Sequence, residues 1–166
     1  MAAKKAAKKK HNGKKSAGDG VGRAITNRRA GFDYDLKDNY QAGLVLSGAE
    51  VKSLRMNHGH LRGAYVNLKD GEAWLFNSTI TPLKTNAAHL PEEIQTRSRK
   101  LLLKHRELAE LAAAKNQGLT IIPTRILTGK HFIKIEIAVG KGKKKFDKRQ
   151  SIKKRDEQRN LQRLVR

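Results

Sequence analysis

Apolar and polar residues alternate most regularly between residues 64 and 77. Val66 and Leu68 lie two positions apart with polar or aromatic neighbours, the pattern of a β-strand with one buried face. Asp70 and Gly71 then supply the two positive-φ positions of a type I′ turn. The segment is therefore predicted to form a β-hairpin.

A second hairpin is predicted over residues 118–139, where two apolar runs flank a turn at residues 128–130. Ile135 belongs to an alternating series of isoleucines that faces one side of the sheet, which places Lys134 on the other side. Pro123 interrupts the first run. Because proline cannot donate a backbone hydrogen bond, its strand is expected to lie at an edge or to contain a bulge.

Helices are expected at two places. Residues 42–48 form a short apolar run typical of a buried strand, and Ser47 and Glu50 have the spacing of a capping box before a helix of two to three turns. Residues 99–118 predict a second helix that ends at Gly118. Its apolar stripe comprises Leu101, Leu108, Leu111 and Ala112.

The order of these elements predicts a mainly β (α+β) fold. Short strands punctuated by glycine, with two or three peripheral helices, fit a small OB-like antiparallel β-barrel that carries a basic C-terminal tail. Barrels of this kind bind nucleic acids on an open face. The fold alone does not establish the function.

Charge divides the chain into three parts. The chain has 37 Lys and Arg against 15 Asp and Glu, a net charge of +22. Residues 1–29 carry ten of these cations against one carboxylate, and residues 141–166 carry twelve against three. We therefore expect a disordered basic arm over 1–25, a barrel over 26–140 and a basic tail over 141–166. Nucleic acid is the leading partner, and an anionic membrane surface is the alternative.

Composition excludes several classes of protein. The chain has no cysteine, which excludes disulfides and thiol catalysis. No apolar run approaches the roughly 18 residues needed to span a bilayer. The N-terminal charges are not followed by the hydrophobic stretch of a secretory signal, so a cytoplasmic location is expected.

The candidate catalytic and metal-binding groups are weak. His58 and His60 have no third ligand nearby in the sequence, which is typical of loop histidines. Residues 140–143 lack the spacing of a phosphate-binding loop. The paired carboxylates at 33 and 35 and at 92–93 lie in polar sequence that would not raise their pKa. We therefore expect no enzymatic activity, no cofactor and no metal.

The C-terminal tail has good helix formers but few apolar residues. A helix over residues 147–166 would be polar almost all round and marginal in water. Neutralisation of its cations by RNA would favour the helix, so the tail is predicted to be disordered when free and helical when bound. A solvated basic tail without this transition is the alternative. Phe146 could stack on an unpaired base, and phosphates could be neutralised by Lys143, Lys144, Lys145, Lys148 and Arg149.

Several segments resemble the SsrA-binding protein family, also called small protein B (SmpB), of bacterial trans-translation. They occur in the family's order and cover about 140 of the 166 residues. The segments are NRRA (27–30), AGLVLSGAEVKSLR (42–55), AYVNLKDGEAWLFN (64–77), RKLLLKHRE (99–107) and GKGKKKFDKR (140–149), which leads into SIKKRDEQR.

The resemblance implies an OB-like barrel that binds the tRNA-like domain of transfer-messenger RNA (tmRNA) and delivers it to stalled ribosomes, where the nascent chain is tagged. The protein would stand in for the missing anticodon arm. Its tail would enter the empty mRNA channel beyond the decoding site and become helical there. The implied partners are tmRNA, the small ribosomal subunit near the decoding site and mRNA channel, and elongation factor Tu with aminoacylated tmRNA. A monomer without membrane association is expected.

The resemblance also implies two sets of site residues. The expected RNA-binding residues are Asn27, Arg28, Arg29, Gln41, Leu102 and Lys134. The residues expected to contact the ribosome near the decoding centre are Lys141, Gly142, Lys143, Lys144, Phe146, Asp147, Lys148, Arg149, Ile152, Lys153, Lys154 and Arg155.

The chain departs from the family pattern at three positions. Gln41 stands where glutamate is expected, Ala49 where a larger residue is usual, and Phe146 where tyrosine or histidine often occurs. Leu102 could also be an ordinary core residue. Two other functions stay open: a general ribosome-associated or structural RNA-binding protein without tmRNA specificity, and an RNA-processing enzyme with an unrecognised site.

Overall fold

The structure of the protein, a computed structural model, describes residues 24–83, 91–129 and 131–164. Its strands are β1 (Ala24–Thr26), β2 (Tyr34–Leu44), β3 (Gly59–His60), β4 (Tyr65–Lys69), β5 (Glu72–Phe76), β6 (Thr79–Ile80), β7 (Arg99–Leu102), β8 (Thr120–Thr128) and β9 (Ile133–Gly142). Its helices are α1 (Ala30–Asp33), α2 (Gly48–Arg55), α3 (Glu92–Gln95), α4 (His105–Asn116) and α5 (Lys145–Leu164). Residues 1–23 of the expected N-terminal arm lie outside the described residues.

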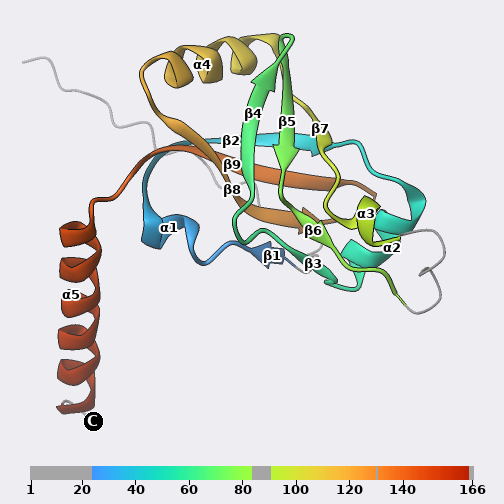
Figure 1. The fold of residues 1–166 in the computed structure, drawn as a ribbon. Helices are drawn as coiled ribbons and strands as arrows, with labels where there is room; N and C mark the ends of the chain where they lie inside the picture. Colours follow the sequence, from blue (N-terminus) through green and yellow to red (C-terminus); the bar gives the residue numbers. More distant parts are fainter. Residues whose placement is uncertain (1–23, 84–90, 130, 165–166) are drawn as a thin grey trace, which may run out of the picture.

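The main sheet is antiparallel and closes on itself. Its strand order is β1-β8-β4-β5-β7-β2-β9, and β8 also pairs with β9. This extra pairing forms a barrel, and β1 pairs with residues 125–127 of β8 (Figure 1). Closure removes the unpaired edges that an open sheet would leave. The expected OB-like, mainly β fold is confirmed, and α2 and α4 are the two longer helices around the described barrel.

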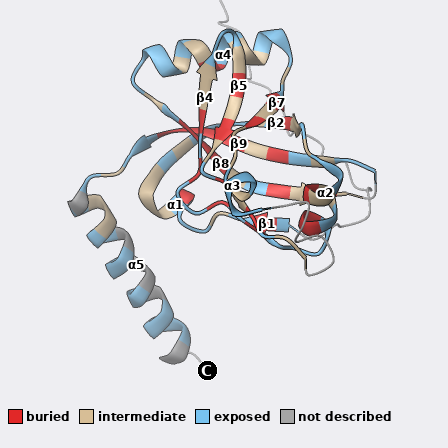
Figure 2. Ribbon diagram, turned by 45° about the vertical axis from the view of Figure 1, so that its right-hand side comes forward, coloured by how far each residue is buried: buried red, intermediate tan, exposed pale blue. Residues whose placement is uncertain are grey.

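Aliphatic side chains fill the barrel interior. Ile135 and Ile137 of β9 are fully buried, as the alternation predicted, whereas Lys134 is exposed. Leu111 of α4 is also fully buried, and its burial contributes about 1.5–3 kcal/mol to holding this helix against the strands. Figure 2 shows the buried residues concentrated along the central strands, with exposed residues on the outer side of α4.

The predicted β4–β5 hairpin and the predicted capping box are confirmed. Asp70 and Gly71 have φ values of +52° and +75°, as a type I′ turn requires. At the start of α2, the backbone N–H of Ser47 donates to Glu50 Oε2 at 2.7 Å, and the backbone N–H of Glu50 donates to Ser47 Oγ at 3.3 Å.

The helix predicted over 99–118 is wrong at its start. Arg99–Leu102 forms β7, and α4 begins only at His105. β7 pairs with β5 on one side and with β2 on the other, so it fills the place between two strands that would otherwise lack a partner. Tertiary pairing here overrides the local preference of leucine and lysine for helix. The end of α4 agrees with the prediction, since Gly118 has a φ of +76°.

Two boundaries near the N-terminus also differ from the expected ones. Ala24 and Ile25, which were assigned to the disordered arm, lie in β1 and pair with β8. β2 runs from Tyr34 to Leu44, whereas the apolar run predicted a strand over 42–48. Only one face of β2 packs on the barrel, so its first half is too polar to be recognised as a strand.

β9 continues two residues beyond the expected end of the barrel at 140. Lys141 and Gly142 pair with Asp35 and Tyr34 of β2, so these two residues belong to the barrel and not to the tail. The two strands approach closely here. A Cβ atom at Gly140 would lie 2.8 Å from the carbonyl oxygen of Asp35, which explains a glycine at this position without any phosphate-binding loop.

The bulge that Pro123 suggested is confirmed. The register between β8 and β9 shifts between Pro123 and Arg125, which leaves Thr124 as the extra residue. Thr124 Oγ1 donates to the carbonyl oxygen of Glu136 at 3.1 Å and so stabilises the bulge.

A buried ion cluster connects α2 with β7. Glu50 and Arg99 are both 0% exposed, and Arg99 Nε donates to Glu50 Oε1 at 2.9 Å. Arg97 Nη2 donates to Glu50 Oε2 at 2.6 Å. Arg99 Nη1 also donates to the carbonyl oxygen of Ser78 at 2.7 Å and to its hydroxyl at 2.9 Å. The buried charges are paired and hydrogen-bonded, the condition under which a protein interior tolerates ions.

The cluster predicts a loss of stability in acid. Burial alone would raise the pKa of Glu50, but hydrogen bonds from Arg97 and Ser47, with the charge of Arg99, hold this pKa below its ordinary value. A depressed pKa in the folded state stabilises the protein above the unfolded-state pKa, and the contribution disappears as pH falls through the folded-state pKa. We expect the stability difference between the wild type and Glu50→Gln, measured by urea unfolding, to shrink as the pH falls below about 5. A difference that stays constant over this range would contradict the prediction.

Candidate nucleic-acid interface

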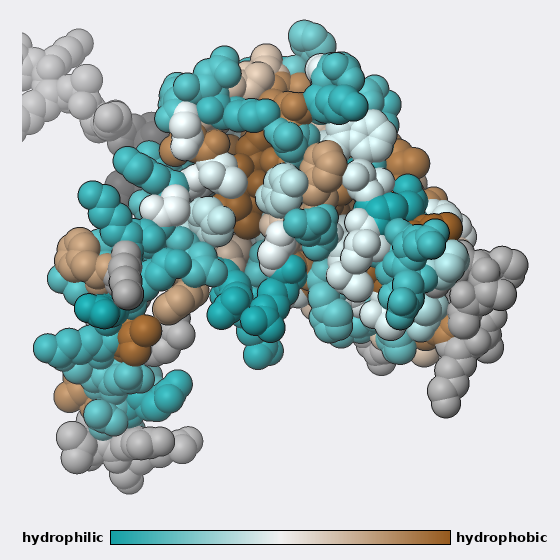
Figure 3. All heavy atoms as spheres, in the orientation of Figure 1, coloured by the Kyte–Doolittle hydropathy of each residue, from teal (hydrophilic) through white to brown (hydrophobic). Residues whose placement is uncertain are grey.

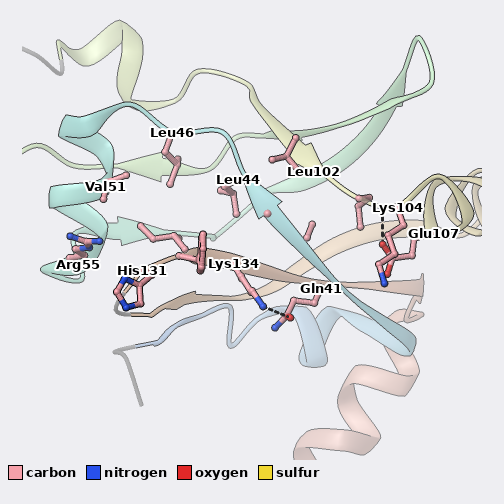
Figure 4. Close-up of a pocket in the computed structure, with 15 residues that line it drawn as sticks. Gln41, Leu44, Leu46, Val51, Arg55, Leu102, Lys104, Glu107, His131 and Lys134 are labelled. Carbon is pink, nitrogen blue, oxygen red and sulfur yellow. Dashed lines mark hydrogen bonds between the residues drawn. The ribbon is translucent and has the colours of Figure 1, made fainter. Parts of the chain in front are cut away.

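An open groove of about 780 Å³ lies where β2, β7 and β9 meet beside the start of α4. This β2–β7–β9 groove brings together Gln41, Leu102 and Lys134, three of the expected RNA-binding residues (Figure 4). Lys134 Nζ donates to Gln41 Oε1 at 3.2 Å. Sheet register produces this arrangement, since Gly43 of β2 pairs with Leu102 on one side and with Lys134 on the other.

Leu102 is a surface residue of the groove. Its side chain is 55% exposed, whereas the neighbouring Leu101 points into the barrel and is 3% exposed. Leu102 lies over Gly43, where an added Cβ would be 3.4 Å from Leu102 Cβ. The alternative that Leu102 is an ordinary core residue is therefore wrong.

The groove combines an apolar floor with cationic sides. Leu44, Leu46 and Val51 are half-buried and line it, while Arg55 and Lys104 contribute positive charge near its ends (Figure 4). Unpaired bases stack on or pack against apolar and planar groups, and cations neutralise the adjacent phosphates. This chemistry suits a folded RNA with exposed bases.

Sequence reasoning missed Phe132, which lines the same groove and is 75% exposed. Its ring centroid lies 6.4 Å from that of His131, so two aromatic rings are neighbours at the turn between β8 and β9. The predicted hairpin over residues 118–139 places Phe132 in its second strand, but β9 begins only at Ile133. Two aromatic residues directly after the predicted turn at 128–130 were the available signal.

A second hollow, of about 480 Å³, contains Asn27 and shares Gln41 with the groove. Asn27 Nδ2 donates to the carbonyl oxygen of Pro123 at 3.0 Å, and its backbone N–H donates to the carbonyl oxygen of Thr124 at 2.7 Å. These two hydrogen bonds of Asn27 connect the end of β1 to the bulge in β8. The side chains of the next two residues, Arg28 and Arg29, are exposed.

The residues expected to contact the ribosome lie apart from this groove, on the end of β9 and on α5. α5 leaves the barrel as a single helix and extends away from it (Figure 1). Phe146, Ile152 and Leu161 are 59%, 45% and 61% exposed, and Figure 3 shows mostly hydrophilic residues around the helix. The structure describes the tail as a helix. Its unfolding in the free protein stays a prediction.

The first turn of α5 is stabilised locally. Asp147 Oδ2 accepts a hydrogen bond from the backbone N–H of Lys144 at 3.1 Å. A carboxylate near a helix N-terminus also interacts favourably with the helix dipole. Asp147 therefore has a local structural role among the surrounding cations.

Within the described residues, neither a metal-binding cluster nor a membrane-spanning helix is present. No group of three or more His, Asp or Glu side chains in this part of the chain is placed to hold a metal ion. None of the helices within the described ranges is both long and apolar enough to cross a bilayer.

Comparison with known proteins gives a consistent result. The family model described as SmpB protein matches residues 24–166. An SsrA-binding protein of Pseudomonas putida is 52% identical over 147 residues, which cover 88% of this chain and 91% of the relative. An SsrA-binding protein of Pseudomonas syringae pathovar tomato is 49% identical over the same shares. A chain of the solved structure "tmRNA-SmpB: a journey to the center of the bacterial ribosome" has a TM-score of 0.61 and 35% identity, over 74% of this chain and 85% of that one.

Proposed function

The chain belongs to the SmpB protein family, and from this premise we propose that it binds the tRNA-like domain of tmRNA and delivers this RNA to stalled ribosomes for trans-translation. The observation that carries the proposal is that the family match runs without a break from the barrel through α5. The chain acts as an RNA-binding protein, and its two structural parts correspond to two tasks.

The barrel binds the RNA. In this proposal the β2–β7–β9 groove holds exposed bases against Leu102, while Lys134 neutralises a phosphate and the Gln41 amide hydrogen-bonds the RNA. Asn27 shapes the adjoining hollow and presents Arg28 and Arg29 to the backbone. The proposal is supported by the apolar floor of the groove, its cationic sides and the net charge of +22.

The tail recognises the ribosome. α5 would enter the empty mRNA channel of the small subunit beyond the decoding site, and an mRNA in that channel would exclude it. The barrel would stand in for the missing anticodon arm, and elongation factor Tu would accompany the aminoacylated tmRNA. The exposure of α5 and its cations along a chain rich in helix formers support this part of the proposal.

A gel-shift titration tests the proposed function. We expect preference for tmRNA over an ordinary tRNA at moderate salt. If about six to ten phosphates are contacted, affinity should fall by about 10³–10⁵ between about 50 and 200 mM salt. Equal affinity for both RNAs at moderate salt would favour a general RNA-binding protein, and a flat salt response would contradict the electrostatic contribution.

Lys134→Ala is expected to weaken tmRNA binding. One phosphate contact and the hydrogen bond to Gln41 are lost, so the affinity should fall by about tenfold and the slope of log affinity against log salt should decrease by about one. The matched control is Lys115→Ala at the other end of α4, which removes the same charge from an exposed position outside the groove. Equal affinities of the two variants for tmRNA would contradict a role of Lys134 in RNA binding.

A further inference from the structure

The junction between the barrel and α5 is held by the backbone of α1. The backbone N–H of Lys143 donates to the carbonyl oxygen of Asp33 at 2.9 Å, and Lys143 Nζ donates to the carbonyl oxygen of Gly31 at 2.8 Å. The chain is therefore attached to α1 immediately after β9 ends at Gly142. These contacts set the direction of the chain where α5 begins.

A side-chain contact in the first turn of α5 attaches the tail to α1 a second time. Lys148 Nζ lies 2.7 Å from Asp33 Oδ1 and 6.0 Å from the centroid of the Phe32 ring. The side chains of Lys148 and Asp33 are 33% and 30% exposed, so this pair is partly shielded from solvent. The hydrogen bond from Lys148 lowers the pKa of Asp33, so the carboxylate form is favoured by this contact. Asp33 thus holds the tail through both its backbone and its side chain.

Lys148 differs from the cations that follow it. Arg149 and Lys153 are exposed and available to an RNA phosphate, whereas the ammonium of Lys148 is directed at α1. Sequence similarity assigned Lys148 to ribosome contact, but its partner lies within the chain. We infer that Lys148 is a positioning residue, which docks the first turn of α5 on Asp33 and Phe32 and thereby sets the direction in which the tail leaves the barrel.

The length of the tail explains why its direction matters. Once the tail is helical on the ribosome, its 20 residues are about 30 Å long, so a tilt of about 20° at the docked first turn displaces the far end by roughly 10 Å. The inference rests on the proposed function, because only a partner with a fixed entrance requires a fixed direction.

A charge-reversal cycle tests the inference in the full-length protein. Asp33→Lys, Lys148→Asp and the double variant would be compared with the wild type in tmRNA gel shifts and in a reconstituted assay of tagging on stalled ribosomes. The matched control is Asp35→Lys, which makes the same charge change on an exposed residue two positions away. Retained tmRNA binding shows that the barrel of a variant is folded.

We expect Asp33→Lys to bind tmRNA as the wild type does but to tag about tenfold more slowly, since a favourable ion pair becomes a repulsive one. The double variant should recover to within about threefold of the wild type, and Asp35→Lys should tag normally. The inference is overturned if Asp33→Lys tags normally, if it loses tmRNA binding, or if the double variant tags no faster than Lys148→Asp. A wild-type protein that neither prefers tmRNA nor supports tagging would instead refute the proposed function.

Discussion

A chain that ends at Lys144 is expected to bind tmRNA but to support no tagging on stalled ribosomes. The truncation removes α5 and leaves β9 and the β2–β7–β9 groove intact. Loss of the tail cations lowers the general attraction to RNA, so the affinity for tmRNA should fall by no more than about tenfold at moderate salt, or about 1.4 kcal/mol. Gel shifts measure the first quantity, and tagging of a stalled nascent chain measures the second.

A proline variant separates the helix from its charge. Glu157→Pro keeps the cations of the tail but interrupts the middle of α5, at a cost of about 3 kcal/mol or more to the helix. Glu157→Ala is the matched control, because it removes the same carboxylate and preserves the helix. We expect Glu157→Pro to lose tagging and Glu157→Ala to retain it. Equal tagging by both variants would show that charge alone is recognised.

Arg99→Met is expected to cost about 3–5 kcal/mol of the free energy of unfolding. The substitution leaves the carboxylate of Glu50 buried with one cation fewer, and it removes the hydrogen bonds to Ser78. Such a loss is a large part of the 5–15 kcal/mol that stabilises a typical domain. Urea unfolding followed by the fluorescence of Trp74, the single tryptophan, measures it.

Arg97→Met is the matched control for this cluster. Its guanidinium bonds the same carboxylate, but its side chain is 36% exposed, so water can replace the lost partner. We expect a cost of about 1 kcal/mol. Equal costs for the two variants would mean that burial of Arg99 does not determine the energetics of the cluster.

The sequence predicted the parts of the fold that local chemistry determines. The β4–β5 turn follows from the positive φ of Asp70 and Gly71, and the start of α2 follows from the capping box between Ser47 and Glu50. The bulge follows from the missing N–H of Pro123. Each of these signals acts within a few residues, so no knowledge of distant strands was needed.

The errors arose where distant strands decide the structure. Residues 99–102 prefer helix locally but form β7 because β2 and β5 both lack another partner there. β2 begins eight residues before the expected strand, since pairing with the end of β9 compensates for its polar sequence. The partner of Glu50 was missed for the same reason, as Arg99 is 49 residues away along the chain.

The candidate RNA site also depends on contacts between residues that are distant in the sequence. Family resemblance selected Gln41, Leu102 and Lys134, but strand register brings them together. Leu102 and Lys134 pair with Gly43 from its two sides, and Gln41 lies two residues before Gly43 on β2. Phe132 was assigned to a strand that begins one residue later. The ion pair of Lys148 was not predicted, because a sequence does not reveal that Asp33 lies 2.7 Å from its ammonium group; its contact with the ribosome stays a prediction.

The central claim is that a folded barrel binds tmRNA while the tail beyond its first turn orders only on the ribosome. A spin label at Asn160→Cys tests this most directly, because the chain has no other cysteine and Asn160 is exposed. The same label at Gln117→Cys, on the barrel side, is the control. We predict a mobile spectrum at position 160 in the free protein and in the tmRNA complex, and an immobilised one only on stalled ribosomes with an empty mRNA channel. A label that is already immobile in the free protein, or still mobile on those ribosomes, would contradict the account.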